Sequence, residues 1–157
     1  TMGNAIVSKF PFYASTSHIL PRGLAPRSLG IVSMNIRRGK LSRHILLLVT
    51  HLSLGKKSRG NQLKQIISVI ARLRARGHPV VLAGDFNTSS TKELAPLHAL
   101  LPIAASAPTH PSWNPRKHLD WIFFSDEFSL DDVNAPQAPL ISDHLPLITH
   151  AHLRVGV

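Results

Sequence analysis

The sequence contains no cysteine, only two glutamates and a single tyrosine among its 157 residues. The absence of cysteine excludes disulfide bonds and thiolate metal sites. No apolar run approaches the roughly 18 residues that a membrane-spanning helix needs, and the longest, at 45–49, has the length of a strand. Hydrophobic residues make up 43% of the chain and charged residues 17%, a composition typical of a folded domain.

Acidic side chains are scarce, with 8 Asp and Glu against 18 Lys and Arg, which gives a formal net charge of +10. This excess favours contact with a polyanion: nucleic acid, anionic lipid headgroups or phosphorylated metabolites. A generally basic surface without a specific partner explains the same charge, because net charge names no partner. Charge alone therefore does not assign a function.

Length predicts one domain, and hydrophobic patterning divides it into short elements. Strands are predicted at 4–10, 29–36, 43–52, 79–84, 118–125 and 144–153, and helices at 61–77 and 91–101. Proline-rich or acidic segments at 11–30, 102–118 and 126–140 are predicted to be mostly loop. The strands 29–36 and 43–52 are expected to pair as an antiparallel hairpin. The result is a β-rich α/β domain with too few crossover helices for an all-parallel sheet.

Polar side chains gather at or beside the ends of these apolar strands in four places. They are His51; Asp85 and Asn87; Asp120; and Asp143 with His144. One polar group at a strand end is ordinary, but four suggest strands that converge on a common pocket.

Asp85 and Asn87 are two residues apart, so in an extended segment their side chains point to the same side. The acid can orient a water or hold a hard cation, and the amide can donate to an anionic oxygen. Asp and Asn also cap turns well, and this pattern alone fits a turn equally.

Asp143 and His144 are adjacent, so on a strand they face opposite ways and do not pair with each other. An external carboxylate is needed to fix the tautomer of the imidazole, and Asp120 is a candidate. Such an Asp–His pair provides a general base or a phosphate contact. Taken alone, the Ser-Asp-His sequence also fits a surface turn.

Three residues near the end of the strand 43–52 and the start of the main helix each have more than one reading. His51 follows a buried strand, where a histidine is most often structural or solvated. Arg59 and Gln62 lie near the start of the main helix, where they could support His51, contact phosphate or form a solvated first turn.

Two other enzyme classes fit poorly. Ser142, Asp143 and His144 are the residue types of a serine hydrolase triad, but contiguous residues cannot adopt triad geometry, and no G-x-S-x-G elbow is present. The ten histidines show no H-E-x-x-H or paired ligand spacing, which argues against a His-rich zinc site.

In their order along the chain, four segments resemble the successive motifs of the endonuclease/exonuclease/phosphatase superfamily. They read VTHLSLGKKSRGNQ (49–62), VVLAGDFN (80–87), LDWIFFS (119–125) and SDHLPL (142–147). GNAIVSKFPF (3–12) is similar to the strand that precedes them in that family. The resemblance implies a four-layer α/β/β/α fold like that of deoxyribonuclease I, in which two sheets form a β-sandwich flanked by helices.

The resemblance also implies hydrolysis of phosphodiester or phosphomonoester bonds by an activated water, with Mg²⁺ or Mn²⁺ as cofactor. It carries the catalytic roles to His51, Asp85, Asn87, Asp120 and His144. It places the metal near Asp85, Asn87 and Asp143, and substrate phosphate near Arg59, Asn87 and His144.

The family pattern begins earlier than this sequence does, with a strand ending in Asn and another ending in a Gln-Glu pair whose Glu holds the metal. Neither Glu93 nor Glu127 has that context. We therefore expect residues 1–157 to form a single domain that lacks its N-terminal portion and first strands. The loss would expose apolar sheet surface, where we expect the chain to self-associate.

This difference sets the functional expectation. With few carboxylates to hold Mg²⁺, we expect weak metal binding and low activity for this chain alone. The alternative is a catalytically impaired fragment that serves as a polyanion-binding module. Nucleic acid and other phosphodiesters, including those of anionic lipid headgroups, stay open as substrates, and the compartment is not indicated.

Overall fold

A computed structural model describes residues 3–38, 41–138 and 141–154. Its strands are β1 (Phe12–Ile19), β2 (Ser28–Arg38), β3 (Leu41–His51), β4 (Val80–Asp85), β5 (Ile103–Ala105), β6 (Asp120–Phe124), β7 (Phe128–Asn134) and β8 (Ile148–Leu153). Its helices are α1 (Lys56–Ala75) and α2 (Thr91–His98). Neither described helix is long and apolar enough to cross a membrane.

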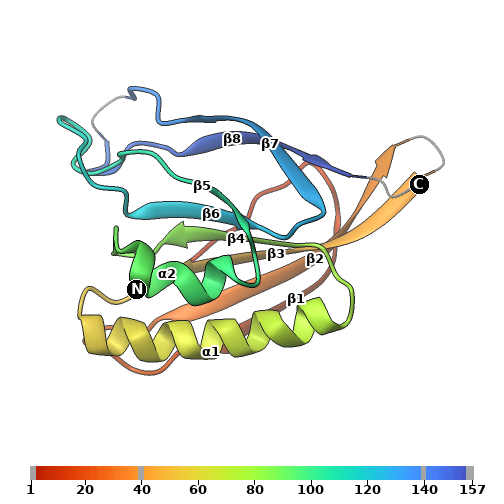
Figure 1. The fold of residues 1–157 in the computed structure, drawn as a ribbon, viewed down its shortest axis with the longest axis horizontal. Helices are drawn as coiled ribbons and strands as arrows, with labels where there is room; N and C mark the ends of the chain where they lie inside the picture. Colours follow the sequence, from red (N-terminus) through yellow and green to blue (C-terminus); the bar gives the residue numbers. More distant parts are fainter. Residues whose placement is uncertain (1–2, 39–40, 139–140, 155–157) are drawn as a thin grey trace.

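Six strands form one mixed sheet in the order β1-β2-β3-β4-β6-β5. Only β3 and β4 pair in parallel, and α1 is the crossover that connects them. Both helices cover one face of this sheet, and the small β7–β8 sheet lies across the opposite face (Figure 1). The antiparallel β2–β3 hairpin is confirmed, and it extends beyond the rest of the molecule at the end opposite the N-terminus of α1 (Figure 1).

The main core lies between the six-stranded sheet and the helices. Alternate residues of the strands, including Leu46, Leu48 and Leu82, pack against Ile66 and Ile70 of α1. These side chains are almost fully buried because strand residues two apart share a face and helix residues four apart share a stripe.

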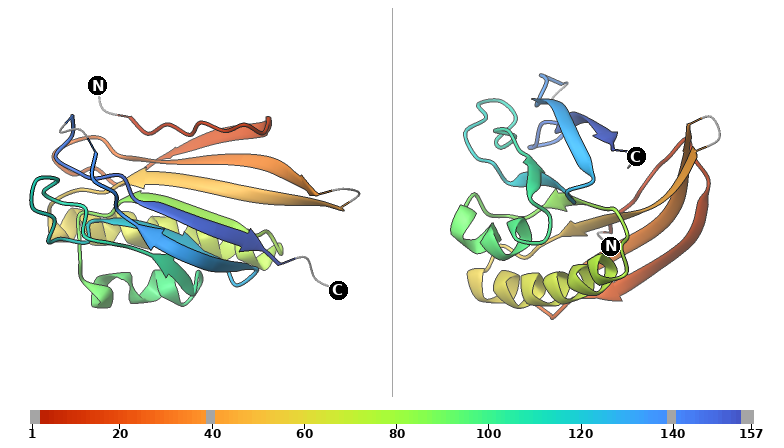
Figure 2. Two further views of the ribbon diagram at one scale, coloured as in Figure 1. Left: turned by 90° about the horizontal axis from the view of Figure 1, so that it is seen from above. Right: turned by 45° about the vertical axis from the view of Figure 1, so that its right-hand side comes forward.

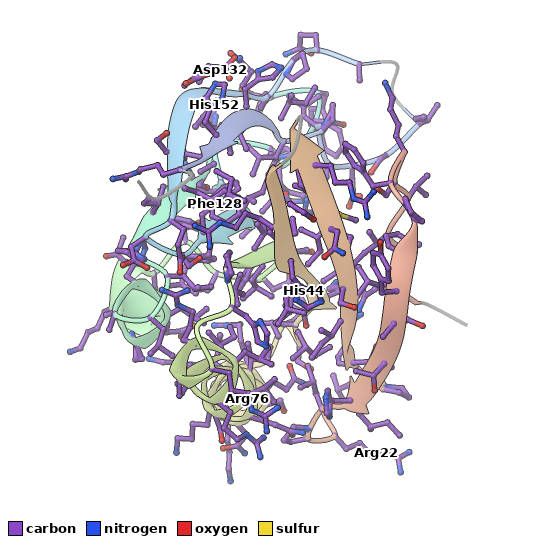
Figure 3. The ribbon with its side chains drawn as sticks, turned by 90° about the vertical axis from the view of Figure 1, so that its right-hand side faces the viewer. Arg22, His44, Arg76, Phe128, Asp132 and His152 are labelled. Atoms are coloured by element: carbon purple, nitrogen blue, oxygen red, sulfur yellow. The ribbon has the colours of Figure 1, made fainter. Side chains whose placement is uncertain are left out.

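A second, smaller core lies on the other face of the sheet. Met34, Ile45 and Phe124 pack there with Phe128, which points from β7 toward the large sheet (Figure 3). The expected pair of packed sheets is thus present only in part, because the second sheet has two strands in the part of the chain that the structure describes. The views in Figure 2 show how little of the large sheet this hairpin covers.

The N-terminal strand was predicted in the wrong place. Residues 4–10 form no strand, and the strand is β1, within the segment 11–30 that was expected to be mostly loop. β1 is an edge strand whose side chains are mostly exposed, Tyr13 by 60% and Ile19 by 83%. A strand with little burial on either face carries no hydrophobic alternation for sequence patterning to detect.

β7 was also missed, because its acidic residues were interpreted as loop. Two of them, Asp131 and Asp132, pair across the hairpin with His152 and His150 of β8. Cross-strand pairs of opposite charge stabilise a sheet, so an exposed strand can contain acidic residues. β8 begins four residues later than expected, because the segment containing Pro146 turns away from the sheet.

Helix α1 begins at Lys56, five residues before its predicted start. Its N-cap residue Gly55 provides no side-chain cap, and its first turn carries lysines where the helix dipole favours acids. Tertiary contacts compensate: Arg59 pairs with Glu93 of α2, and Gln62 is fully buried. These contacts override the tendency of the basic segment 54–60 to form a loop.

Close packing of β4 against β3 requires glycine at position 84. Gly84 has φ +155°, and a Cβ atom there would lie 1.9 Å from the carbonyl oxygen of Thr50. Because that oxygen belongs to the neighbouring backbone, only separation of the strands would relieve the contact. Gly84 therefore fixes how closely Asp85 approaches β3.

We predict that Gly84→Ala lowers the free energy of unfolding by about 2–4 kcal/mol, since it combines backbone strain with a steric clash. Chemical denaturation monitored by circular dichroism measures the change. The matched control is Gly60→Ala in α1, where a Cβ meets nothing within 4 Å. That substitution should stabilise the protein by about 0.5–1 kcal/mol, so equal effects at the two positions would contradict the packing argument.

Candidate functional site

Three of the predicted site residues lie in one row across the edge of the large sheet. The register pairs His51 of β3 with Asp85 of β4, and Asp85 with Asp120 of β6. Each strand delivers its residue at the same edge, since β6 runs antiparallel to β4 and begins where β4 ends. Neighbouring strands are about 4.8 Å apart, so the three side chains are adjacent.

The turn that Asp85 and Asn87 were expected to favour is present, and the extended segment of the other reading is not, because Asn87 departs from the extended conformation. Asp85 Oδ1 accepts the backbone N–H of Asn87 at 2.8 Å, and Asn87 adopts a left-handed φ of 50°. The Asn87 side chain in turn donates from Nδ2 to the carbonyl of Leu52 at 2.9 Å. This turn ends β4 and keeps both side chains at the site.

Asp120 holds His144 in place. Its Oδ2 atom lies 2.7 Å from His144 Nδ1 and also accepts a hydrogen bond from the hydroxyl of buried Thr109. The chain around His144 is tied to the loop at 109–112: Leu145 N–H donates to the Thr109 carbonyl, and Ser112 N–H donates to that of Asp143. A loop distant in sequence is thus fixed beside β6, and Nε2 of His144 is left for other partners.

These side chains open into one cleft of about 570 Å³. It is lined by Arg27, His51, Leu54, Asp85, Asn87, His110, Lys117, Leu119, Asp120, Ser142, Asp143 and His144. The structure therefore brings together every predicted catalytic residue and every predicted metal ligand. Their chemical roles stay predictions.

The electrostatics of the row differ from residue to residue. Burial lowers the pKa of His51 below its ordinary value, and the nearby charge of Arg27 acts in the same direction against the opposing effect of Asp85. Nε2 of His51 lies 3.4 Å from Asp85 Oδ2. A lowered pKa keeps His51 neutral at neutral pH.

Asp85 and His144 show the opposite tendency. Burial raises the pKa of the Asp85 carboxyl, and the adjacent carboxylate of Asp120 raises it further, although the hydrogen bond from Asn87 opposes both. Burial disfavours protonation of His144, but its hydrogen bond to Asp120 and the surrounding carboxylates outweigh it and raise the His144 pKa. His144 is therefore protonated more readily than a free imidazole, and Asp85 more readily than a free carboxylate.

Arg59 does not lie where a phosphate contact requires. Its side chain is 8% exposed. The guanidinium donates from Nε and Nη2 to Glu93, and from Nη1 to the carbonyls of Ser53 and Leu54. It does not line the cleft. The predicted phosphate role of Arg59 is thus not supported, because its donors are used within the protein.

Gln62 also has a structural role. Its Oε1 accepts the backbone N–H of Ser53, and its Nε2 donates to the carbonyl of Pro21 and to Ser53 Oγ. Together with Arg59 it fixes the segment that follows His51.

Both glutamates lie outside the cleft. Glu93 pairs with Arg59, and Glu127 pairs with Arg74 at 2.6 Å. The arginine partners lower the pKa of each carboxyl despite the opposing effect of burial at Glu127. Within the described residues, neither therefore replaces the glutamate ligand of the family pattern.

Sequence reasoning missed three charged or titratable residues of the cleft: Arg27, His110 and Lys117. His110 lies beside His144, with ring centroids 4.9 Å apart, and its Nε2 is 3.9 Å from Asp143 Oδ2. All three are in loops that belong to none of the motifs, so only the folded chain shows that they face the site. A basic residue next to a strand start, as at Arg27, is too common to serve as a signal.

The sequence matches the model of the Endonuclease/Exonuclease/phosphatase family over residues 1–144. The chain belongs to this family. No curated protein matches the chain in sequence. The family explains the order of the motifs and the shared fold, whereas the geometry above describes how this chain builds its own site.

Solved structures of the family have the same fold. The human Nocturnin catalytic domain with bound sulfate superposes with a TM-score of 0.69 at 20% identity, covering 92% of this chain and 60% of that one. A Bacteroides thetaiotaomicron mannosyl-6-phosphatase gives 0.73 at 17% identity, covering 92% and 68%. D. rerio TDP2 complexed with a single-stranded DNA product gives 0.63 at 18% identity, covering 90% and 68%. This chain thus spans between three fifths and about two thirds of these relatives.

Family members are metal-dependent, and the cleft contains suitable donors. Asp85 Oδ2, the amide oxygen of Asn87 and the exposed carboxylate of Asp143 are the hard oxygen ligands that Mg²⁺ prefers. Asp143 also forms a group with His110 and His144 whose ligand atoms lie within 4.8 Å of one another. Transition metals accept such a mixed donor set more readily than Mg²⁺ does.

We predict that Asp85→Asn stabilises the protein at neutral pH when divalent cations are absent. Because the pKa of Asp85 is raised in the folded state, its ionisation costs more there than in the unfolded chain. The melting temperature of Asp85→Asn should therefore be higher than that of the wild type.

The difference in stability between Asp85→Asn and the wild type should vanish below a pH of about 3.9, where aspartate in the unfolded chain is protonated. It should grow as the pH rises through the pKa of Asp85 in the folded protein. Differential scanning calorimetry across this range measures it. Asp131→Asn, on exposed β7, is the control and should show no such gain. A variant less stable than the wild type at pH 7 would contradict the prediction.

Proposed function

We propose that this chain carries the catalytic residues of a divalent-metal-dependent phosphodiesterase that uses an activated water. The supporting observation is the row of His51, Asp85 and Asp120, completed by the His144–Asp120 hydrogen bond of 2.7 Å. This arrangement combines a carboxylate that can accept a proton with imidazoles that can donate hydrogen bonds to anionic oxygens.

The pKa directions suggest the division of roles. Asp85, whose pKa is raised, takes a proton from the attacking water as the new P–O bond forms and the ester P–O bond breaks. The imidazolium of His144, whose pKa is also raised, donates hydrogen bonds to the phosphate oxygens as their charge increases. Neutral His51 donates to the leaving oxygen, which takes its proton from solvent.

Mg²⁺ or Mn²⁺, held by Asp85, Asn87 and Asp143, would neutralise charge on the phosphate when bound. Asn87 is positioned for the phosphate as well, since only one hydrogen of its Nδ2 is used by Leu52. The cleft is basic at its rim, where Arg27 and Lys117 lie. The substrate is accordingly proposed to be a phosphodiester of a polyanion, with nucleic acid as the first choice.

One observation favours the alternative of a polyanion-binding module with impaired catalysis. Both glutamates are engaged in ion pairs outside the cleft, so the described cleft offers only aspartates as acidic ligands. A basic cleft with a weakly held metal would still bind polyanions without turnover.

We predict that the chain hydrolyses bis-p-nitrophenyl phosphate, and nicks plasmid DNA, only with Mg²⁺ or Mn²⁺. Asp85→Ala should lower kcat by about 10²–10⁴-fold, the usual contribution of a positioned general base. Release of p-nitrophenolate gives the rates. Asp131→Ala, which removes an exposed carboxylate of β7 far from the cleft, is the matched control.

Equal loss of activity in the two variants would contradict the role of Asp85. No hydrolysis of either substrate by the wild type would favour the binding module, which should still retain plasmid DNA in a gel-shift assay.

We predict that this chain binds Mg²⁺ and Mn²⁺ more weakly than micromolar, because few carboxylates face the cleft. Asp143→Asn should remove most of the heat of binding in an isothermal titration, whereas Asp126→Asn, outside the cleft, should not. Micromolar affinity in the wild type would show that the ligands present are sufficient.

A further inference from the structure

Arg27 is a basic residue of the cleft without a described protein partner. It lies in the loop between β1 and β2, directly before Ser28, and lines the cleft beside His51. Its Nε atom is buried and has no hydrogen-bond partner among the described residues. By contrast, Arg59 and Arg74 are both paired with carboxylates.

An unpartnered buried N–H group is uncommon and calls for an explanation. Guanidinium binds phosphate in a bidentate manner because its donors match the spacing of phosphate oxygens. The charge of Arg27 acts on His51, which places it at that end of the row. An anionic group of a ligand would therefore complete the hydrogen bonding of Arg27.

The position of Arg27 indicates which phosphate it would contact. It precedes β2, and β2 is separated from β4 by β3, so the start of β2 lies about 10 Å from Asp85 across the sheet edge. His51 occupies the intervening position. His51 therefore lies between Arg27 and a phosphate that is held by Asp85 and His144.

We propose that Arg27 binds a second phosphate of the substrate, next to the one that is cleaved. This inference rests on the proposed function, which places the cleaved phosphate at Asp85 and His144. A substrate with regularly spaced phosphates satisfies both positions, and Lys117 lies near the other end of the row, just before β6. The row of sites along a sheet edge fits a nucleic-acid strand better than a compound with one phosphate.

Isothermal titration without divalent cations tests the second phosphate independently of turnover. The probes are thymidine 3′,5′-bisphosphate and thymidine 5′-monophosphate, which differ by one phosphate. We expect the wild type to prefer the bisphosphate, and Arg27→Gln to reduce the ratio of the two affinities about tenfold, as expected for one charge-assisted hydrogen-bonded contact. Arg27→Lys keeps the charge and should retain part of the preference.

Arg22→Gln is the matched control, since Arg22 is in the same loop but exposed at the outside of the molecule (Figure 3). It should keep the wild-type ratio. An unchanged ratio in Arg27→Gln, with a melting temperature equal to that of the wild type, would overturn the proposal. If Arg27→Gln unfolds, the ratio in Arg27→Lys decides: a ratio equal to or above that of the wild type overturns it, and a lower ratio supports it.

A third probe identifies the kind of polyanion. Tighter Arg27-dependent binding of inositol 1,4-bisphosphate than of thymidine 3′,5′-bisphosphate would overturn the assignment to nucleic acid.

A hydrolysis assay distinguishes failure of this inference from failure of the proposed function. Absence of phosphodiester cleavage with the bisphosphate preference intact contradicts only the proposed function, whereas cleavage without any preference contradicts only the second phosphate site.

Discussion

Two carboxylates face each other on neighbouring strands, and the site is organised around their repulsion. The β4–β6 register places Asp85 directly opposite Asp120, an arrangement that destabilises a sheet unless other groups compensate. His144 compensates at Asp120 through a 2.7 Å hydrogen bond, and His51 approaches Asp85 from β3. Gly84 lets β4 lie close against the backbone of β3, which keeps His51 next to Asp85. The fold thus retains an unfavourable charge pair that a purely structural sheet edge would lack.

Burial and neighbouring charges divide the titratable groups of the site into distinct chemical types. The Asp85 pKa rises because its burial and its acidic neighbour both disfavour the carboxylate, while the paired His144 is more readily protonated. His51 is partly buried and close to Arg27, so it loses its proton more readily. Environments that separate the pKa values of neighbouring groups are typical of acid–base sites. The row of strand ends and the loop that carries His144 together therefore provide an acceptor of protons and two imidazole donors.

The sequence predicted the row but not its surroundings. Asp85 ends an apolar run and Asp120 begins one, so periodicity locates both residues. Asp120 could be named as a partner of His144 because the adjacent Asp143 was expected to face the opposite way on a strand, although the structure places Asp143 and His144 in a loop. Arg59 shows the limit of this approach. A basic residue in a motif fits phosphate as well as an ion pair, and only the position of Glu93 in α2 distinguishes them. β1 and β7 were missed because exposed strands lack the burial pattern on which such predictions depend.

The motif that contains Arg59 still acts on the site, through the backbone. Arg59 and Gln62 bind the backbone of Ser53 and Leu54, directly after His51, and so tie the end of β3 to the start of α1. Residues of the motifs thereby fix the reacting groups, whereas the loops contribute Arg27, His110 and Lys117 to the rim. The positions of the strand ends are set by the register of the sheet, whereas loops tolerate changes of sequence and length. These rim residues belong to no motif, so the family assignment leaves the substrate unspecified.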